Sequence, residues 1–328
     1  MKKYEFTNAT QEVNNHILHR IKALKDFGDV HKGDLGGWLE KESNLSHEGT
    51  CWVSDYAIVY GEAYVGENAK VGERASVIDS ANISGNARVY GATMVSEHAR
   101  VYKDAQIYGD ALVYGNAVIC DDAEIYDNAQ VYDDACIGGT AKVYEGACIG
   151  GTAKVYGKAQ VYGTAWVLGD AFLRGTAKVY GDAEVYEGAS VGGNAQVYDK
   201  ASIRGTAQVY GKAQVYGTAW VYDDARVSDD AQVYGNAQVY EEASIRGTAK
   251  VYDEAKVWGT AKVYGNAKVY GAAWVLDDAQ VYGNAWVLDD ASIGGTAEVS
   301  GKARVYGDAQ VYGNARVKNA YIVDIAIV

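Results

Sequence analysis

The sequence predicts an all-β fold, a parallel β-solenoid in which a short strand and a turn recur every six residues. Two observations indicate this fold. Every sixth residue from Ala57 to Ala315 is alanine, with Thr93 as the exception. Every sixth residue from Val59 to Val323 is valine, isoleucine or leucine. The frame crosses this span without an insertion or deletion, and a fixed short period of this kind is typical of solenoid proteins.

Each repeat is expected to begin as a strand and to end as a turn. Ala57 and Val59 lie two residues apart, so an extended segment points both side chains to one side. The residue between them points outward, and Gly61 and Glu62 follow as a turn. Gly, Asn and Asp are frequent at these turns, and they tolerate positive φ. The alanine and the branched aliphatic residue of each repeat therefore form the predicted core.

The outward residue after each aliphatic position indicates how many strands make one coil. Sampled every eighteen residues from Tyr90 to Tyr306, this position is tyrosine except at Leu288, whereas the two other phases are mixed. Three phases of different character predict three inequivalent faces, and so a triangular prism with 18 residues per coil. About 15 coils stacked ~4.8 Å apart would form a rod of roughly 70 Å. The predicted tyrosine column consists of Tyr90, Tyr108, Tyr126, Tyr144, Tyr162, Tyr180, Tyr198, Tyr216, Tyr234, Tyr252, Tyr270 and Tyr306.

A longer repeat is superimposed on the hexads. The segments KVYGKAQVYGTAW (154–166), QVYGKAQVYGTAW (208–220) and KVYGNAKVYGAAW (262–274) recur at an interval of three predicted coils. This echo indicates that the array grew by duplication of three-coil blocks.

The first 50 residues lack the hexad frame and predict a small N-terminal β cap, with the solenoid in residues 51–328. YEF (4–6) and HILHRIKAL (16–24) predict two strands, and DLGGWLEKESNLS (34–46) predicts a turn that leads into the first coil. Because the end of a solenoid exposes unpaired strand edges, capping is the expected role. A docking module for another protein is the alternative, with Trp38 and Trp52 as its candidate residues.

Residues 18–52 also carry distinctive motifs. They are Leu18-His19-Arg20-Ile21, Asp26-Phe27, Asp29-Val30, Gly33, Gly36-Gly37-Trp38, Asn44-Leu45-Ser46 and Cys51-Trp52. Together with the hexad pattern, these residues resemble the N-terminal segment of the YdcK-like family, which comprises bacterial hexapeptide-repeat proteins with phage-encoded relatives. The resemblance implies a single-stranded left-handed parallel β-helix. The period does not give this hand, since parallel crossovers are normally right-handed. The resemblance implies no assigned activity.

Charge and composition restrict the classes of partner. The net charge of −13 argues against nucleic acid and against an anionic membrane. No apolar run approaches the ~18 residues of a membrane helix, and the N-terminus lacks the apolar core of a signal peptide. The cysteines form no CxxC pair and are expected to be free thiols in a reducing compartment. We therefore expect a location in the cytoplasm or in a phage particle.

Candidate residues for chemistry are few. Many left-handed β-helices are acyltransferases that use coenzyme A or nucleotide-sugar substrates, so the resemblance raises an enzyme of this type as an alternative. His98 lies in the repeat, beside Glu97, but the unbroken frame leaves no inserted loop to build a pocket around it. The other four histidines lie in the first 50 residues, without cysteine or acidic partners at the spacing of a metal site. The sequence thus predicts no catalytic residue, no metal and no cofactor.

The tyrosine column is the candidate interaction face. The residue two before each tyrosine is usually long and polar, as at Arg88, Gln106 and Lys142. The rings could stack along the molecule, form an oligomer contact, or bind a linear glycan through their faces. We predict a non-enzymatic structural scaffold that associates with copies of itself or with another structural protein. The alternatives are a module that binds a glycan or a protein through this face, and an acyltransferase-like enzyme.

Overall fold

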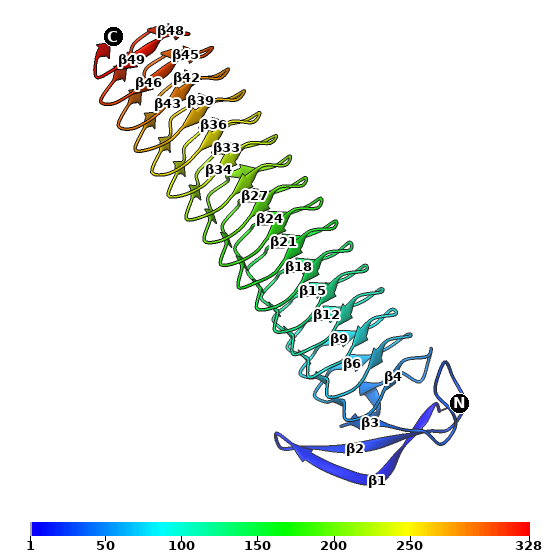
Figure 1. Ribbon diagram of the computed structural model, residues 1–328. Coiled ribbons are helices and arrows are strands. Elements are labelled where there is room, and N and C mark those ends of the chain that lie inside the picture. Colours follow the sequence, from blue (N-terminus) through cyan, green and yellow to red (C-terminus); the bar gives the residue numbers. More distant parts are fainter. Residues whose placement is uncertain (1) are drawn as a thin grey trace. The chain divides into compact units, whose positions relative to one another are not determined.

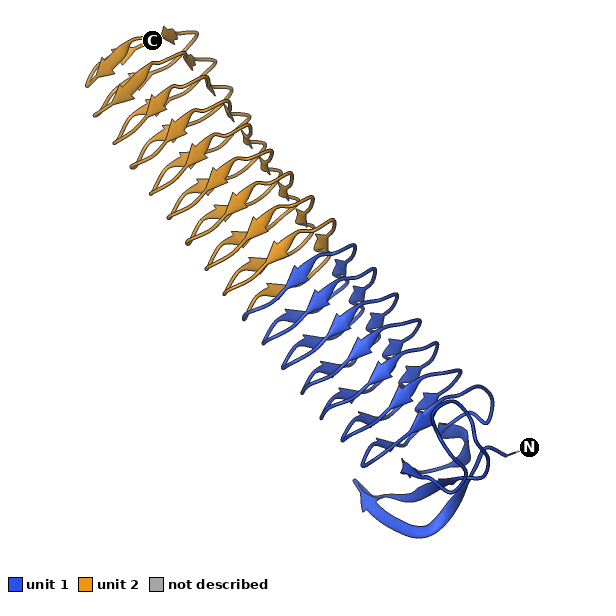
Figure 2. Ribbon diagram, turned by 45° about the vertical axis from the view of Figure 1, so that its right-hand side comes forward, with its two compact units in different colours: residues 1–163 blue, residues 164–328 orange. Residues whose placement is uncertain are grey.

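The computed structural model describes residues 2–328, and the chain divides into two compact units, Met1–Gly163 and Thr164–Val328 (Figure 2). Each unit is a parallel β-solenoid in which residues 18 apart pair in register, as Val89 pairs with Ile107 and Val197 with Val215. In residues 2–328 the helical structure is confined to the 3-10 turn η1 (Glu42–Asn44). The predicted all-β parallel solenoid with 18-residue spacing is therefore confirmed.

Three parallel sheets make up the repeats of unit 1, and most strands contain only the outward residue and the buried aliphatic residue. Sheet 1 contains β3 (Leu35–Leu39), β5 (Ile58–Val59), β8 (Ser76–Val77), β11 (Met94–Val95), β14 (Leu112–Val113), β17 (Gln130–Val131) and β20 (Cys148–Ile149). Sheet 2 contains β4 (Trp52–Val53), β7 (Lys70–Val71), β10 (Arg88–Val89), β13 (Gln106–Ile107), β16 (Glu124–Ile125), β19 (Lys142–Val143) and β22 (Gln160–Val161). Sheet 3 contains β6 (Tyr64–Val65), β9 (Asn82–Ile83), β12 (Arg100–Val101), β15 (Val118–Ile119), β18 (Cys136–Ile137) and β21 (Lys154–Val155).

Unit 2 has the same three-sheet organisation. Its sheet 1 contains β23 (Trp166–Val167), β26 (Glu184–Val185), β29 (Ser202–Ile203), β32 (Trp220–Val221), β35 (Gln238–Val239), β38 (Lys256–Val257), β41 (Trp274–Val275), β44 (Ser292–Ile293), β47 (Gln310–Val311) and β50 (Ala326–Ile327). Its sheet 2 contains β25 (Lys178–Val179), β28 (Gln196–Val197), β31 (Gln214–Val215), β34 (Gln232–Val233), β37 (Lys250–Val251), β40 (Lys268–Val269), β43 (Trp286–Val287), β46 (Arg304–Tyr306) and β49 (Tyr321–Val323). Its sheet 3 contains β24 (Phe172–Leu173), β27 (Ser190–Val191), β30 (Gln208–Val209), β33 (Arg226–Val227), β36 (Ser244–Ile245), β39 (Lys262–Val263), β42 (Gln280–Val281), β45 (Glu298–Ser300) and β48 (Arg316–Lys318).

The core consists of the two inward positions of each hexad. Ala195 and Val197 are fully buried, and the equivalent alanines and aliphatic residues from Ala57 to Val311 are buried in the same way. Burial of one valine side chain contributes roughly 1.5 kcal/mol or more. Alanine keeps the cross-section of the coil narrow, while the branched residues suit the pleated strands.

The first residue of each corner has positive φ and is glycine, aspartate or glutamate at most positions, for instance Asp199 (φ 58°) and Gly217 (φ 72°). A Cβ at Gly217 would lie 2.9 Å from the backbone nitrogen of Gly235, one coil further on. Where an acid occupies the corner, its carboxylate accepts a hydrogen bond from the backbone N–H one coil further on, as Glu241 Oε2 does from Gly259 N at 2.9 Å. This bond offsets the cost of the left-handed conformation in a residue other than glycine.

The N-terminal segment extends sheet 1 of unit 1 by antiparallel strands. β1 (Tyr4–Val13) pairs with β2 (His16–Ala23), and β2 pairs with β3 (Figure 1). β3 then pairs in parallel with β5, in the manner of the hexad strands. The expectation of a turn over residues 34–46 was therefore wrong in part, because this segment contains β3. The role of residues 1–50 as a cap stays a prediction.

The hexad frame ends at Val317, and the expectation that it continues to Val323 was wrong. Val305 pairs with Ile322 and Val311 with Ile327, at intervals of 17 and 16 residues. Each of the two last corners has thus lost one residue.

An Asn or Asp side chain compensates for each lost residue. Asn319 and Asp324 both have positive φ. Asn319 Oδ1 accepts a hydrogen bond from Lys302 N at 2.8 Å, and Asp324 Oδ1 accepts one from Asp308 N at 2.9 Å. At regular corners a backbone carbonyl accepts this bond, as Gly301 O does from Asn284 N. The side-chain oxygen therefore takes the place of a carbonyl.

Thr93, the exception in the alanine column, provides a test of the core. Its side chain is fully buried, and its Oγ1 has no hydrogen-bond partner within residues 2–328. We expect the isosteric change Thr93→Val to raise the free energy of unfolding by about 1–3 kcal/mol, because it removes an unsatisfied buried hydroxyl. Urea denaturation of both proteins measures the difference. Equal or lower stability of the variant would show that the hydroxyl is satisfied.

Candidate interaction faces

The tyrosine column forms stacks of nearly parallel rings in each unit. In unit 1 the rings of Tyr108, Tyr126, Tyr144 and Tyr162 follow sheet 2 at centroid separations of 4.8–4.9 Å. In unit 2 the stack runs from Tyr180 to Tyr270, with separations of 4.8–5.0 Å and interplanar angles of 5° or less. The rings therefore stack along each unit, which is the first of the three interpretations of this column.

The ends of the column depart from this stacking. Tyr90 packs against Gly72, where an added Cβ would lie 2.8 Å from Tyr90 Cε1. The ring of Tyr270 meets Trp286 edge-on at 6.3 Å. The Trp286 ring lies 4.7 Å from Lys268 Nζ and 4.3 Å from the guanidinium carbon of Arg304. Tyr306 forms the last residue of β46.

Stacking determines which parts of the tyrosine rings are available. Each inner ring has a neighbour on both faces, so the solvent reaches ring edges and hydroxyl groups rather than π faces. The hydroxyls contact the polar stripe, as Tyr180 Oη does with Gln196 Oε1 at 3.2 Å and Tyr108 Oη with Glu124 Oε2 at 3.3 Å. A sugar ring needs an open aromatic face, so this geometry disfavours the glycan interpretation for the column.

Burial in the stack changes the acidity of the tyrosines. Loss of solvent raises the pKa of Tyr144, Tyr198 and Tyr252 to about 12, and the neighbouring tyrosine hydroxyls add to the effect. Desolvation disfavours the charged phenolate, which explains the direction. These three tyrosines are therefore neutral phenols over the whole range of ordinary pH.

A second aromatic feature lies on sheet 1 of unit 2, and sequence analysis did not identify it as a site. Trp166, Trp220 and Trp274 begin β23, β32 and β41, three coils apart, and their exposed fractions are 47%, 44% and 44%. We call these three residues the tryptophan row. The longer repeat in the sequence could have indicated this row, because each of its three segments ends in tryptophan.

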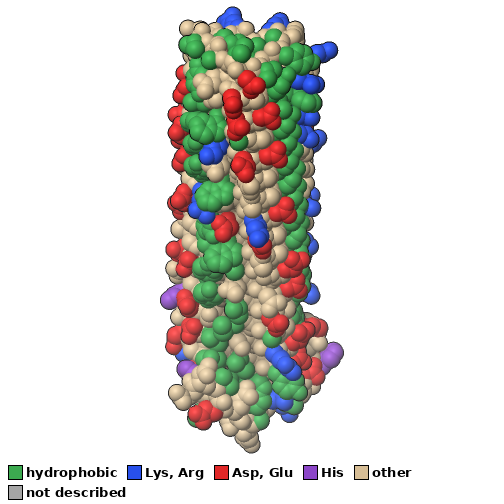
Figure 3. Space-filling model, turned by 60° about the vertical axis from the view of Figure 1, so that its left-hand side comes forward, with side chains coloured by type: hydrophobic (Ala, Val, Ile, Leu, Met, Phe, Trp, Pro, Cys, Tyr) green, Lys and Arg blue, Asp and Glu red, His purple; other side chains and the backbone are tan. Residues whose placement is uncertain are grey.

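The rings of Trp220 and Trp274 have charged neighbours, and Trp274 also meets Trp258 edge-on at 5.4 Å. Arg204 places its guanidinium carbon 5.1 Å from the Trp220 ring and pairs with Glu184 at 3.1 Å. Lys256 Nζ lies 5.6 Å from the Trp274 ring. Figure 3 shows that hydrophobic side chains lie next to cationic and acidic ones at the surface.

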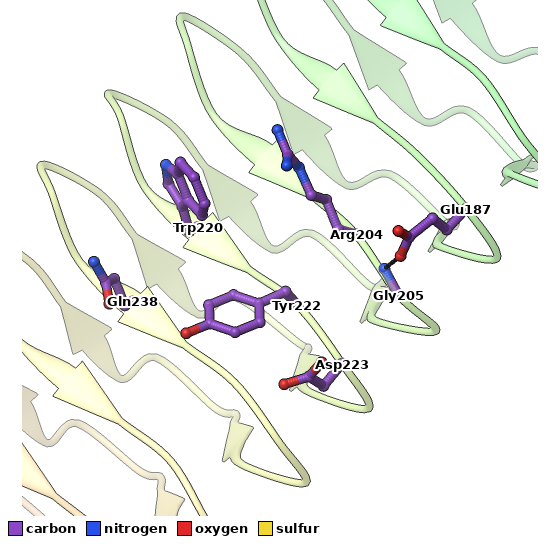
Figure 4. Close-up of a pocket in the computed structure, with 7 residues that line it drawn as sticks. All are labelled: Glu187, Arg204, Gly205, Trp220, Tyr222, Asp223 and Gln238. Carbon is purple, nitrogen blue, oxygen red and sulfur yellow. Dashed lines mark hydrogen bonds between the residues drawn. The ribbon is translucent and has the colours of Figure 1, made fainter.

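A shallow cleft lies beside Trp220. Trp220 and Gln238 line it from the neighbouring strands β32 and β35, Arg204 follows β29, and Tyr222 lies beside them (Figure 4). Glu187 accepts a hydrogen bond from Gly205 N at the edge of the cleft. The cleft is lined by Glu187, Arg204, Gly205, Trp220, Tyr222, Asp223 and Gln238. It combines two aromatic side chains with charged groups of both signs and a neutral amide.

The two tryptophans of the N-terminal segment differ in exposure. Trp52 is buried, at 5% exposure, and its ring meets Phe27 edge-on at 5.4 Å. Trp38 is half-buried, with the Arg20 guanidinium carbon 5.7 Å from its ring. Trp52 thus packs in the interior of this segment, and Trp38 is the more accessible candidate for docking.

The histidines acquire partners that the sequence spacing did not indicate. His16 Nδ1 lies 2.8 Å from Glu40, and His47 Nε2 lies 2.9 Å from Glu42. Within residues 2–328, His, Cys, Asp and Glu form no group of three or more that could hold a metal ion. His98 is exposed, and the carboxylate of Glu97 accepts a hydrogen bond from Gly115 N at 3.0 Å instead of orienting the imidazole.

In the part of the chain that the structure describes, no helix combines the length and the hydropathy needed to cross a membrane.

Comparisons with known proteins agree with the repeat. The model of the YdcK β-solenoid repeat matches residues 81–97, 105–121, 219–235 and 309–323. The uncharacterized acetyltransferase YdcK of Escherichia coli (strain K12) is 44% identical over 55 residues, which is 16% of this chain. The chain covers 17% of that relative's length. The predicted resemblance to the YdcK-like family is confirmed over these parts of the chain.

The raised pKa of Tyr198 predicts a loss of stability at alkaline pH. Unfolded tyrosine ionises near pH ~10, whereas Tyr198 in the stack has a pKa of about 12. Between these values the unfolded state binds fewer protons, so the free energy of unfolding falls as the pH rises through this window. Below pH ~10 the contribution is fully present.

The control for this experiment is Tyr198→Phe, which keeps the stacked ring and removes the hydroxyl. The difference between the phenolate absorbance titrations of the two folded proteins isolates Tyr198, and urea denaturation at each pH measures stability. We expect a difference midpoint near 12 and a shallower loss of stability in the variant. A midpoint near 10 would contradict the burial of this hydroxyl.

Proposed function

We propose that the chain is a non-enzymatic structural scaffold that associates with copies of itself through the tryptophan row. The exposure of Trp166, Trp220 and Trp274 carries this proposal. Elsewhere the outward side chains largely serve coil-to-coil contacts, as in the tyrosine stacks and the corner carboxylates. The tryptophan row therefore has aromatic surface that the contacts between coils leave exposed.

The composition of the row suits a second copy of the same chain. Tryptophan and arginine are enriched at protein interfaces and dominate their binding energy. A two-fold contact joins a patch to itself, so charges of both signs within one patch can complement each other across it. Arg204 and Glu184 lie side by side near Trp220 and provide one charge of each sign.

A linear glycan is the second candidate for the same row. Its rings are three coils apart, or about 14 Å, and polar side chains such as Gln238 stand between them. Exposed aromatic rings at this spacing, with hydrogen-bonding neighbours, also suit a neutral, hydroxyl-rich chain. This candidate differs from the sequence-based one, which placed the glycan on the tyrosine column.

The acetyltransferase in the relative's name provides a further alternative. The match between that relative and this chain covers 55 residues. Acetyl transfer would need a positioned base and an acetyl donor site. Gly115 N donates a hydrogen bond to the Glu97 carboxylate, so this carboxylate does not orient His98. We therefore favour the scaffold.

Light scattering tests the scaffold. We expect the purified protein to have a mass above the monomer value of 35.2 kDa, because the row pairs with a second copy. The double change Trp220→Ser with Trp274→Ser should restore the monomer mass. Tyr210→Ser, at a residue 42% exposed on another sheet of unit 2, is the matched control and should leave the mass unchanged. A monomeric wild-type protein at high concentration would contradict self-association.

Two binding measurements on the same proteins separate the alternatives. A glycan array signal that the double variant loses and Tyr210→Ser keeps would favour the glycan candidate. Saturable binding of acetyl coenzyme A to the wild-type protein, measured by calorimetry, would contradict the non-enzymatic scaffold. We expect neither signal.

A further inference from the structure

A buried lysine at the start of the N-terminal hairpin lies against a buried cysteine. Lys3, just before β1, and Cys51, just before β4, are both fully buried. Lys3 Nζ lies 3.1 Å from Cys51 Sγ and 2.9 Å from Cys51 O. The Phe27 ring covers the amine at 5.1 Å. The two side chains thus meet in a pocket closed to bulk solvent.

The surroundings favour the uncharged form of the Lys3 amine. Removal of a lysine from water disfavours the ammonium ion, and burial lowers the pKa of Lys3. The Cys51 thiol has carbonyl acceptors in Ser46 O at 3.5 Å and Glu48 O at 3.6 Å. The thiol proton can therefore point to these carbonyls, which leaves a sulfur lone pair directed at the Lys3 amine.

We propose that Lys3 and Cys51 form an oxidative cross-link site, in which one oxygen atom bridges Lys3 Nζ and Cys51 Sγ. The co-reactant is dioxygen, which is small enough to enter a packed interior. One N–H bond and the S–H bond break, and one N–O and one O–S bond form. The second oxygen atom leaves as water with the two hydrogens. Nitrogen and sulfur each lose two electrons, and dioxygen accepts all four.

The other cysteines provide internal controls. Cys136 Sγ lies 2.8 Å from Tyr156 Oη, and Cys148 donates to Gly146 O at 3.7 Å. Among the cysteines of residues 2–328, Cys51 is the one whose sulfur lies within hydrogen-bond distance of a lysine amine. The cross-link is therefore specific to the pair of Lys3 and Cys51.

The bridge would fasten the N-terminal segment to the solenoid. Lys3 and Cys51 are 48 residues apart, and the intervening chain contains β1, β2 and β3. A covalent link across a loop of this length restricts the unfolded chain, in the same way as a disulfide. The oxidised protein should therefore unfold at a higher temperature than the reduced protein.

Mass spectrometry of the full chain tests the proposal. The protein is held in air-saturated buffer or under dithiothreitol and digested without prior reduction. We expect a peptide pair that joins Lys3 to Cys51, heavier than the sum of its parts by one oxygen and lighter by two hydrogens. Fragmentation distinguishes Lys3 from the neighbouring Lys2. Dithiothreitol should remove the pair and lower the unfolding temperature.

Two variants complete the experiment. Cys136→Ser should retain the peptide pair, and Lys3→Arg should abolish it. The wild-type measurement decides the question even if Lys3→Arg fails to fold. Recovery of Cys51 as a free thiol after exposure to air, or as a sulfinic acid with an unmodified Lys3, would overturn the proposal.

Discussion

Parallel pairing at an interval of 18 residues is the constraint on which the rest of the structure depends. It places Val197 next to Val215 and repeats the same contact in both units. Because side chains alternate along a strand, a slip of one residue would exchange the core face for the solvent face. The same interval stacks like residues on like residues at the surface. The tyrosine stacks and the carboxylate bonds at the corners are both consequences of this register.

The core and the tyrosine column could be predicted because both depend on periodicity alone. Ala57 and Val59 identify the inward positions by their spacing, and sampling every eighteen residues identifies the stacked rings. Residues outside the frame were harder to place. β3 lies in a stretch with two adjacent glycines, Gly36 and Gly37, which suggested a turn. Close approach explains both glycines: a Cβ would lie 2.6 Å from Val53 O at Gly36 and 2.5 Å from Ala57 O at Gly37.

The candidate sites were less accessible to sequence reasoning, for physical reasons. The large number of tyrosines suggested a binding face, but regular stacking covers the faces of their rings. The three tryptophans are few, and their exposure follows from the small or polar neighbours on sheet 1, such as Ser202 and Gln238 beside Trp220. The pair of Lys3 and Cys51 joins positions 48 residues apart through the fold of the hairpin. No local pattern in the sequence reports such a contact.

The short corners at Asn319 and Asp324 show which part of a solenoid sets its repeat length. A corner can lose one residue and keep its hydrogen bond when an Asn or Asp oxygen replaces the carbonyl. The repeat length is therefore a property of the corners, and the strands do not determine it. Val317, Ile322 and Ile327 pair in register with the buried Val299, Val305 and Val311, at five-residue steps after a long series of six-residue steps. Hexapeptide and pentapeptide periods can thus share one continuous sheet, and a search that assumes a single period would divide such a chain into two unrelated repeats.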